Sequence, residues 1–207
     1  MNEALAALYA RRLTQPTQGE PLPFLDRVVG LTRTYQTRVP NGPDGETRAV
    51  FFPVPVAFTA AECEADPRYL VPDQHSASIL WFEDGGTVPV LEAANVQGWI
   101  STLRLKLWLN PERLQGALDM PAILNALDRA MQLRYQSHAP PFTNLRATYA
   151  QLPGGPEVVS AYSYETPMVY PPYALLHLEI KTRFLLAASC YNAPLPTLKP
   201  LDACLTY

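Results

Sequence analysis

Two segments of the chain, residues 101–109 and 176–186, alternate almost without error between apolar and polar side chains. Since successive β side chains point to opposite faces, each segment is predicted to be a strand with one face in a core and the other offered to solvent or to a partner. The apolar row of the first segment consists of Leu103, Leu105, Leu107 and Leu109. Its opposite row consists of Thr102, Arg104, Lys106 and Trp108.

Two further segments carry the apolar spacing of amphipathic helices. Residues 2–14 place Asn2 at a possible cap, Glu3 in the first turn and two arginines near the end, in the order that favours a short helix. The main helix is predicted to begin after Asp119, a good capping residue, with Pro121 tolerated in the first turn. One buried stripe then contains Met120, Ile123, Leu124, Leu127 and Met131.

A long hairpin is predicted from two β-prone runs, 27–39 and 49–58, which flank the turn-rich sequence NGPDGE at 41–46. Pro53 and Pro55 cannot donate hydrogen bonds to a ladder. The second run is therefore expected to be an edge strand or to leave the sheet at that point.

Turn residues also indicate a second hairpin, formed by 78–82 and 87–91 around EDGG at 83–86. Two more strands, 144–152 and 158–164, are predicted on either side of PGGP. Strands outnumber helices and mostly follow one another, so the expected fold is α+β. It would have a mostly antiparallel sheet with long hairpins, one main helix packed on a face and a short N-terminal helix.

The composition predicts a single α+β domain over 1–207 with extended proline-rich arms, because 22 prolines are spread along the chain. Only 17% of residues are charged, which favours a surface partly covered by subunit contacts. The net charge of −3 argues against a general nucleic-acid binder. Apolar stretches are too short for a bilayer span, and no signal peptide is evident. We therefore expect cytosolic synthesis.

Candidate chemistry is sparse, and no motif for a nucleophile, a phosphate loop or a dinucleotide is present. His177 and Glu179, with Cys190 downstream, match half of a zinc-deaminase motif, but the P-C-x-x-C half is missing. On an alternating strand these residues are better explained as cross-strand or intersubunit charge pairs. His75 and His138 are expected in exposed loops. We therefore predict no metal, no cofactor and no enzymatic activity.

The strongest surface candidate is a cluster of tyrosines interleaved with prolines, because tyrosine offers a large rigid contact at low entropic cost. Two interpretations stay open: a subunit-contact arm, or a loop that packs on its own domain. Together with two aromatic residues of the arm at 47–58, the candidate subunit interface comprises Phe51, Phe52, Tyr162, Tyr164, Tyr170 and Tyr173.

Four stretches of the sequence resemble uncharacterised proteins of tailed phages and prophages of Bacteroidetes-type hosts. The stretches are RAVFFPVPVAF, RYLVPDQHSASILWFEDGG, WISTLRLKLWLNPERL and YALLHLEIKTRFLLAASC, and the likeness in pattern and element order covers roughly residues 48–190. Such proteins are similar to neck and tail-completion components, including tail terminators, which are small α+β proteins that form rings where head and tail join. The resemblance implies no catalytic residue.

The resemblance leads to the hypothesis of a non-enzymatic virion structural protein, a ring-forming homo-oligomer of the phage neck or tail that acts in head-tail joining or tail completion. Its partners would be copies of itself and other neck or tail proteins, with no membrane and no sequence-specific nucleic acid, although DNA could pass through a lumen. The alternative hypothesis is a small-molecule or carbohydrate-binding module that uses the tyrosine-rich loop. An enzyme without a recognisable motif is a third.

Overall fold

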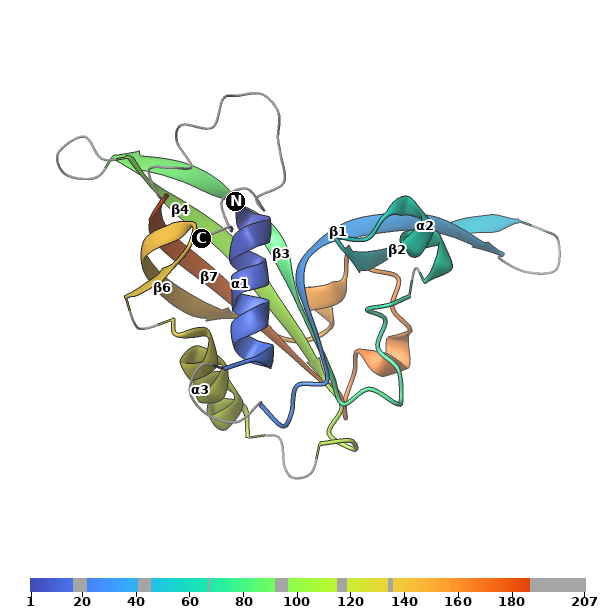
Figure 1. Ribbon diagram of the computed structural model, residues 1–207. Helices are drawn as coiled ribbons and strands as arrows, with labels where there is room; N and C mark the ends of the chain where they lie inside the picture. The colour runs from blue at the N-terminus through green and yellow to red at the C-terminus, as the bar shows by residue number, and fades with distance from the viewer. Residues whose placement is uncertain are drawn as a thin grey trace.

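The chain folds around one curled sheet with helices on one of its faces (Figure 1). This computed structural model describes residues 1–16, 22–40, 46–66, 68–91, 97–114, 119–133 and 136–186. The strands are β1 (Arg27–Pro40), β2 (Thr47–Pro55), β3 (Ser78–Leu91), β4 (Gln97–Leu109), β5 (Ser137–Ala139), β6 (Phe142–Leu152) and β7 (Ala174–Leu186). The helices are α1 (Asn2–Thr14), α2 (Ala60–Ala65) and α3 (Met120–Met131), with 3₁₀ turns η2 (Pro156–Val159) and η3 (Thr166–Met168).

The sheet has the strand order β2-β1-β3-β4-β7-β6-β5, and its neighbours are antiparallel except for the parallel pair β1–β3. The predicted mixed fold in which strands dominate is therefore confirmed. The two alternating segments are its central strands, β4 and β7, whose leucine rows pair directly, as in Leu105 opposite Leu178. All four leucines predicted to face the core on β4 are fully buried.

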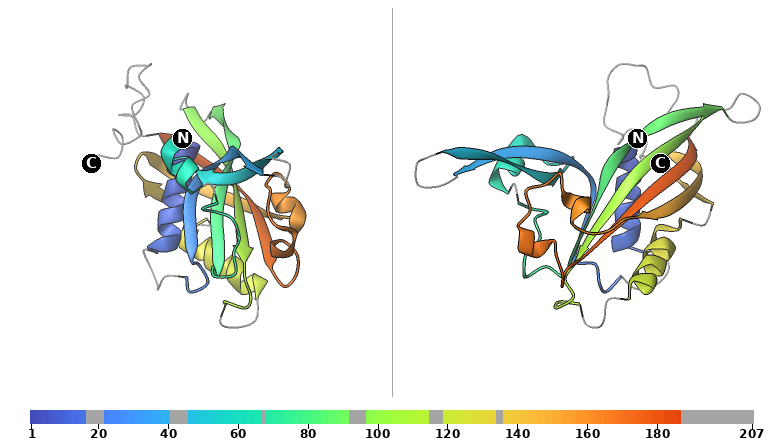
Figure 2. Two further views of the ribbon diagram at one scale, coloured as in Figure 1. Left: turned by 90° about the vertical axis from the view of Figure 1, so that its right-hand side faces the viewer. Right: turned by 180° about the vertical axis from the view of Figure 1, so that it is seen from behind.

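Helices α1 and α3 share one face of the sheet, so the prediction of a single main helix on that face is too narrow (Figure 2). The stripe of α1, which includes Leu5, Tyr9 and Leu13, is buried in the same core as Ile123 and Leu127 of α3. One apolar stripe on each helix covers the leucine rows of the sheet. We call the opposite side of the sheet, on which neither α1 nor α3 packs, the helix-free face.

Of the two helices on this face, only α3 begins at its predicted cap. The carboxylate of Asp119 accepts a hydrogen bond from the Ala122 N–H at 3.1 Å, as a capping residue should. Asn2, by contrast, is the first residue of α1 and does not cap it. Its side chain instead bonds to β3, where it donates to Asp84 and accepts from the Thr87 hydroxyl at 2.6 Å.

The predicted second hairpin around EDGG is wrong, because residues 78–91 form one long strand, β3. Asp84 pairs with Leu103 and Thr87 with Ser101, so one extra residue is accommodated as a β-bulge. A Cβ on Gly85 would lie 2.7 Å from Thr102, and Gly86 has a φ of +93°. Bulges and hairpin turns both need such glycines, which is why the sequence did not separate them.

The predicted strand at 158–164 is also wrong. Gly155 has a φ of +109° and leads into η2, whose residues Val158 and Val159 are buried. They belong to a second, smaller core on the helix-free face, together with Leu70, Ile79, Trp81, Trp108 and Leu175. Residues 153–173 thus fold over part of the face that the alternation had assigned to solvent or to a partner.

Strand β1 changes partners along its length and so forms an arm. Its first residues pair with β3, whereas residues 32–40 pair with β2 from Thr32 opposite Pro55 to Pro40 opposite Thr47. Strand β2 is an edge strand, as its prolines predicted. Figure 1 shows β1 and β2 leaving the body of the molecule, with α2 beside them. None of the described helices is long and apolar enough to cross a membrane.

Candidate functional site

The helix-free face carries charged side chains in rows that run across the strands. Glu83 of β3, Arg104 of β4 and Glu179 of β7 are directly opposite one another in the sheet register. In the next row Lys106 lies opposite His177. Because directly opposite residues share a face, these groups form alternating charges on one surface. Glu179 also forms an ion pair with Lys181 of its own strand, with 3.1 Å between Oε1 and Nζ.

The most enclosed part of this face is the ion pair between Lys106 and Glu83, with 2.6 Å between the ammonium Nζ and the carboxylate Oε1. The Lys106 side chain is 7% exposed and that of Glu83 is 20% exposed. Trp81 donates its indole N–H to the same carboxylate oxygen at 3.4 Å. A charge in such surroundings needs its partner, since an unpaired buried charge is strongly unfavourable.

Tyr162 completes the network from the segment that folds over the face. Its hydroxyl donates to Oε1 of Glu83 at 2.5 Å, and its ring centre lies 5.2 Å from the Lys106 ammonium. Burial, followed by the negative charge of Glu83, raises the pKa of Tyr162 above its ordinary value of 10.0. Burial also raises the pKa of its neighbour Tyr164. Both hydroxyls therefore act as hydrogen-bond donors at neutral pH.

A cleft of ≈ 340 Å³ opens beside this network. It is lined by Glu83, Arg104, Lys106, Leu152, Pro153, Glu157, Val158, His177 and Glu179. The Nε2 atom of His177 is buried there, and no described residue bonds to it. Burial, and next the positive charge of Lys106, lower the pKa of His177 below 6.5. The imidazole is therefore neutral at pH 7, and its Nε2 atom is enclosed beside the cleft.

The six residues predicted to form a subunit interface lie in different environments. Tyr162, Tyr164 and Tyr173 are partly buried on their own domain: the Tyr164 hydroxyl donates to the Leu70 carbonyl at 2.9 Å, and the Tyr173 ring stacks on Trp108 at 5.2 Å. Three of the four tyrosines thus contact their own chain, which is the second of the two open interpretations.

The other three residues differ more sharply in exposure. Tyr170 is 50% exposed and Phe51 is 38% exposed, whereas Phe52 is buried in the arm beneath the Arg68 guanidinium. Tyr170 and Phe51 therefore remain the members of the predicted set that another molecule could reach. The carbohydrate-binding alternative keeps one well-exposed ring, that of Tyr170.

The candidate metal ligands do not come together in the described part of the chain. His177 and Glu179 share the helix-free face, while Cys190 lies outside the described residues. Among the residues that the structure describes, no three His, Cys, Asp or Glu side chains are grouped to hold a metal ion. His75 and His138 are both exposed, as predicted, but only His75 is in a loop, because His138 lies on strand β5.

The alternating pattern did not identify the Lys106–Glu83–Tyr162 network, because it assigned Lys106 to a face open to solvent or to a partner. One available signal was Trp108, an aromatic residue on the polar row of β4, which is fully buried. A second signal, Trp81, lies at an equivalent position on β3 and is buried as well. Large aromatic side chains on a polar row indicate that another segment covers that row.

Taken together, the site is a surface of paired charges, stiffened by tyrosine hydroxyls, beside a cleft with one neutral imidazole. Such a surface is suited to recognition by charge complementarity. Comparison of the chain with family models, with curated proteins and with solved structures finds no match.

Proposed function

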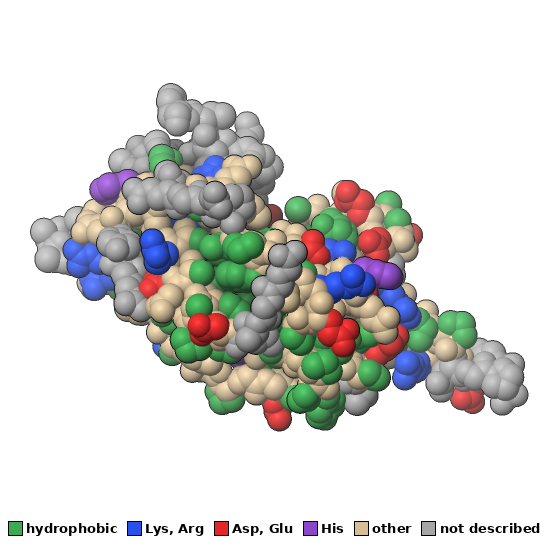
Figure 3. Space-filling view, turned by 90° about the horizontal axis from the view of Figure 1, so that it is seen from below, with side chains coloured by type: hydrophobic (Ala, Val, Ile, Leu, Met, Phe, Trp, Pro, Cys, Tyr) green, Lys and Arg blue, Asp and Glu red, His purple; other side chains and the backbone are tan. Residues whose placement is uncertain are grey.

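We propose that this chain is a non-enzymatic structural protein of a phage virion, a ring-forming subunit of the neck or tail that acts in head-tail joining or tail completion. The sequence resemblance suggests the setting. The observation that carries the proposal is the two-stranded arm formed by β1 and β2, which projects from the body (Figure 3).

The far half of the arm has little of its own chain to pack against. Gln36, Arg38 and Pro40 are exposed on β1, and residues 47–49 are exposed on β2. The two strands nevertheless keep nine paired positions in register. A two-stranded hairpin is only marginally stable in water, and an open edge strand presents unpaired backbone groups. Contact with a neighbouring molecule would stabilise this part of the arm.

Exposed apolar side chains lie at two different ends of the molecule, as a head-to-tail contact requires. Phe51 is on the arm, whereas Val88 and Leu91 are 56% and 86% exposed at the far end of β3. Figure 1 shows that end of β3 on the side opposite the arm. A contact between unlike surfaces is heterologous and generates a closed ring when its rotation closes.

In such a ring the helix-free face would line either the lumen or a subunit interface. Its rows of charge would suit polar partners, including other neck or tail proteins, and the passage of DNA through a lumen. The face would act through shape and charge and not through a chemical step. Localisation in the virion follows from the same proposal.

Electron microscopy of particles assembled with a tail-tube partner tests the proposal. The isolated chain is expected to be a monomer or a labile oligomer, because arms often become ordered only on assembly. In the particle it should form a closed ring in which the arm of one subunit contacts the next, with about 800 Å² buried per partner.

A matched pair of variants makes this test specific. Phe51→Asp places a charge on the arm, and Gln151→Asp places the same charge at an exposed position on β6. The first should prevent ring formation while its thermal midpoint stays within about 2 °C of the control. Rings that form equally well with both variants, or particles that lack the chain, would count against the proposal.

A further inference from the structure

The outer edge of β1, on the side away from β2, is open along the arm. Strand β1 last pairs with β3 at Leu31, and Figure 1 shows the two strands diverging beyond that point. The direction of the backbone groups follows from Phe51 of β2, whose N–H and C=O are both bonded by Ser163 and so point away from β1. Gln36 is directly opposite Phe51, and directly opposite residues of an antiparallel ladder either exchange both bonds or neither. The N–H and C=O of Gln36 therefore point away from β2.

The open edge has defined ends. Because the backbone groups alternate along a strand, Thr34 and Arg38 point outward like Gln36. All three residues are exposed, and no described residue bonds to their outward backbone groups. Toward the tip the run ends at Pro40, which has no N–H. Toward the body it ends at Thr32, whose hydroxyl donates to the Phe82 carbonyl of β3 at 3.0 Å.

The edge of β2 on the other side of the arm is mostly closed. Its outward positions are Thr47, Ala49, Phe51, Pro53 and Pro55, by the same alternation. The backbone groups of Phe51 are already bonded, and the two prolines have no N–H to donate. Only Thr47 and Ala49 keep both outward groups on this edge, against three residues on β1.

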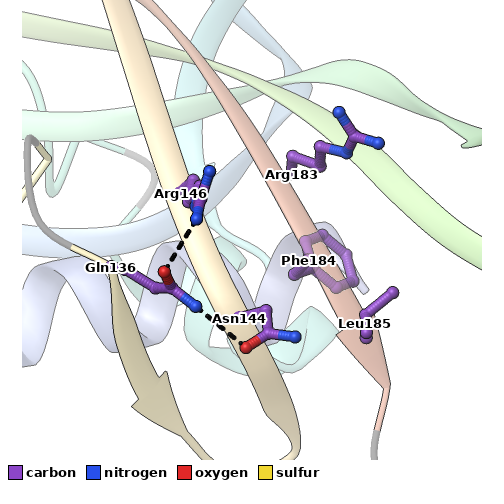
Figure 4. Close-up of a pocket in the computed structure, with 6 residues that line it drawn as sticks. All are labelled: Gln136, Asn144, Arg146, Arg183, Phe184 and Leu185. Carbon is purple, nitrogen blue, oxygen red and sulfur yellow. Dashed lines mark hydrogen bonds between the residues drawn. The ribbon is translucent and has the colours of Figure 1, made fainter. Parts of the chain in front are cut away.

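The start of the opposite sheet edge is covered as well. Strand β5 pairs with the first residues of β6. Just before β5, the Gln136 side chain donates to Asn144 at 3.0 Å and accepts from Arg146 at 2.8 Å (Figure 4). Native proteins protect edge strands in such ways, because an open edge is a template for pairing with another chain. The unprotected edge of β1 is therefore a candidate interface.

We propose that this edge pairs with the same edge of a second copy of the chain, antiparallel and about a two-fold axis at Gln36. Thr34 of one copy then faces Arg38 of the other, and Gln36 faces Gln36. Each facing pair exchanges two backbone hydrogen bonds, about six in all. Because the open run is bounded at both ends, this register is the one that pairs all of its outward groups. The two arms become one continuous sheet, which offsets the marginal stability of a lone hairpin.

The side chains in this register are self-complementary on both faces of the joined sheet. On one face Arg38 meets Thr34, so no like charges are opposed. On the other face Tyr35 meets Thr37, and aromatic and β-branched residues stabilise antiparallel strands when they are directly opposite. A register centred on Arg38 would instead oppose two arginines, which is unfavourable. The sequence of the edge therefore favours a second copy centred on Gln36.

Charge also favours this arrangement at the far end of the contact. Thr34 interacts with the Tyr162 hydroxyl, which donates to Glu83. Arg38 of the second copy, opposite Thr34, would therefore approach the carboxylate of Glu83. Such an approach places a positive side chain of one copy near a negative one of the other.

The two-fold contact differs from the head-to-tail contact of the proposed ring. It is isologous, so it cannot build a ring by itself, and it involves the edge of β1 and not Phe51 or the far end of β3. A pair of strands over 34–38 buries well under the about 800 Å² per partner of a standard interface. The isolated chain is therefore expected to form a weak dimer, with a Kd of about 10–1,000 µM. Failure of ring assembly would leave this expectation unchanged.

Sedimentation velocity of the full chain over a range of concentrations tests the proposal. Gln36→Pro removes an outward N–H, and the two-fold axis doubles the loss, so the dimer Kd should rise at least about tenfold. Ala49→Pro is the matched control, because it removes an outward N–H from the β2 edge of the same arm. Its dimer Kd should change by less than about threefold. Neither proline takes a hydrogen bond from the β1–β2 ladder, so both thermal midpoints should stay within about 4 °C of the wild type.

A charge exchange at Gln36 tests the axis itself. Gln36→Glu and Gln36→Lys each place two like charges directly opposite one another, so each variant alone should dimerise at least about threefold more weakly than the wild type. A mixture of the two variants opposes unlike charges and should form a heterodimer that is tighter than either homodimer.

Weakening by Gln36→Pro but not by Ala49→Pro, together with recovery in the mixture, would support the two-fold pairing. A monomer at every concentration up to about 1 mM would overturn it. So would a dimer that Gln36→Pro leaves intact, equal weakening by both prolines, or a mixture that associates no better than its components.

Discussion

The buried ion pair on the helix-free face predicts a large effect from a substitution that the sequence pattern would treat as mild. Lys106→Met removes the ammonium but keeps most of the apolar stem, so packing against Tyr162 changes little. Glu83 then loses the cation 2.6 Å from its Oε1 atom while it remains beneath the covering segment. The variant should therefore be destabilised by the unpaired charge and not by a cavity.

The magnitude follows from the surroundings of the pair. Removing one partner of a buried ion pair costs about 3–5 kcal/mol, whereas an exposed pair contributes about 0–1 kcal/mol. Glu83 keeps hydrogen bonds from Tyr162 and Trp81, and its side chain is 20% exposed. The free-energy cost of leaving its charge unpaired is therefore smaller than that of a fully buried carboxylate. We expect a loss of about 2–3 kcal/mol, which for a chain of this size lowers the thermal midpoint by about 4–12 °C.

The assay is urea unfolding at pH 7, with Lys181→Met as the matched control. Lys181 lies on the same face, and its side chain is 58% exposed. The same Lys→Met substitution there removes an exposed ion pair, the one with Glu179. The control should lose less than about 1 kcal/mol. Glu83→Gln should also destabilise the protein, and the double variant with Lys106→Met should lose about 1–3 kcal/mol less than the sum of the single losses. Equal losses for the two lysine variants, or strict additivity in the cycle, would refute this account.

Further predictions concern the core and two titrating groups. Leu107→Ala on the apolar row of β4 should cost about 2–5 kcal/mol in urea unfolding, and Thr148→Ala on the exposed side of β6 should cost far less. His177 has a lowered pKa, so the unfolded chain takes up its proton first and stability should fall as the pH drops below about 6.5. His177→Gln should flatten that dependence, and an unchanged pH profile would contradict the burial of this imidazole. Burial raises the pKa of Tyr9 to about 12, so its contribution is present below about pH 10 and lost as the pH rises toward 12. Tyr9→Phe, which loses the hydrogen bond to Thr182, should be less stable at about pH 8 by roughly 1 kcal/mol but lose less stability on going to about pH 11.

Local patterns in the sequence predicted the elements whose signals are themselves local. The alternation of apolar and polar residues predicted β4 and β7 with the correct core-facing rows. The cap at Asp119 and the apolar stripe that follows it predicted α3. These features depend on which side chains fall on one face, and that is fixed by neighbours within a few residues.

The sequence-based predictions were wrong where two local structures need the same residues, or where a segment distant in the sequence determines the burial of a side chain. The glycines of EDGG satisfy a bulge as well as a turn, and only the pairing of Thr87 with Ser101 selects the bulge. The state of Lys106 depends on Tyr162, 56 positions later in the printed sequence, folding over it. Alternation records that one row is polar, but it does not record what covers that row.

The covering segment links the charged face to the arm through three consecutive residues. Tyr162 bonds to Glu83 on the sheet, and Tyr164 bonds to the carbonyl of Leu70. Between them, the Ser163 N–H donates to the Phe51 carbonyl at 2.8 Å, and the Phe51 N–H donates to the Ser163 hydroxyl at 3.1 Å. The middle of the arm is therefore fastened to the same segment that encloses the ion pair. If the arm contacts a neighbouring subunit as we propose, that contact is connected through Phe51 and Ser163 to the segment that covers the ion pair. The buried charges would then help to fix the orientation of the arm relative to the sheet.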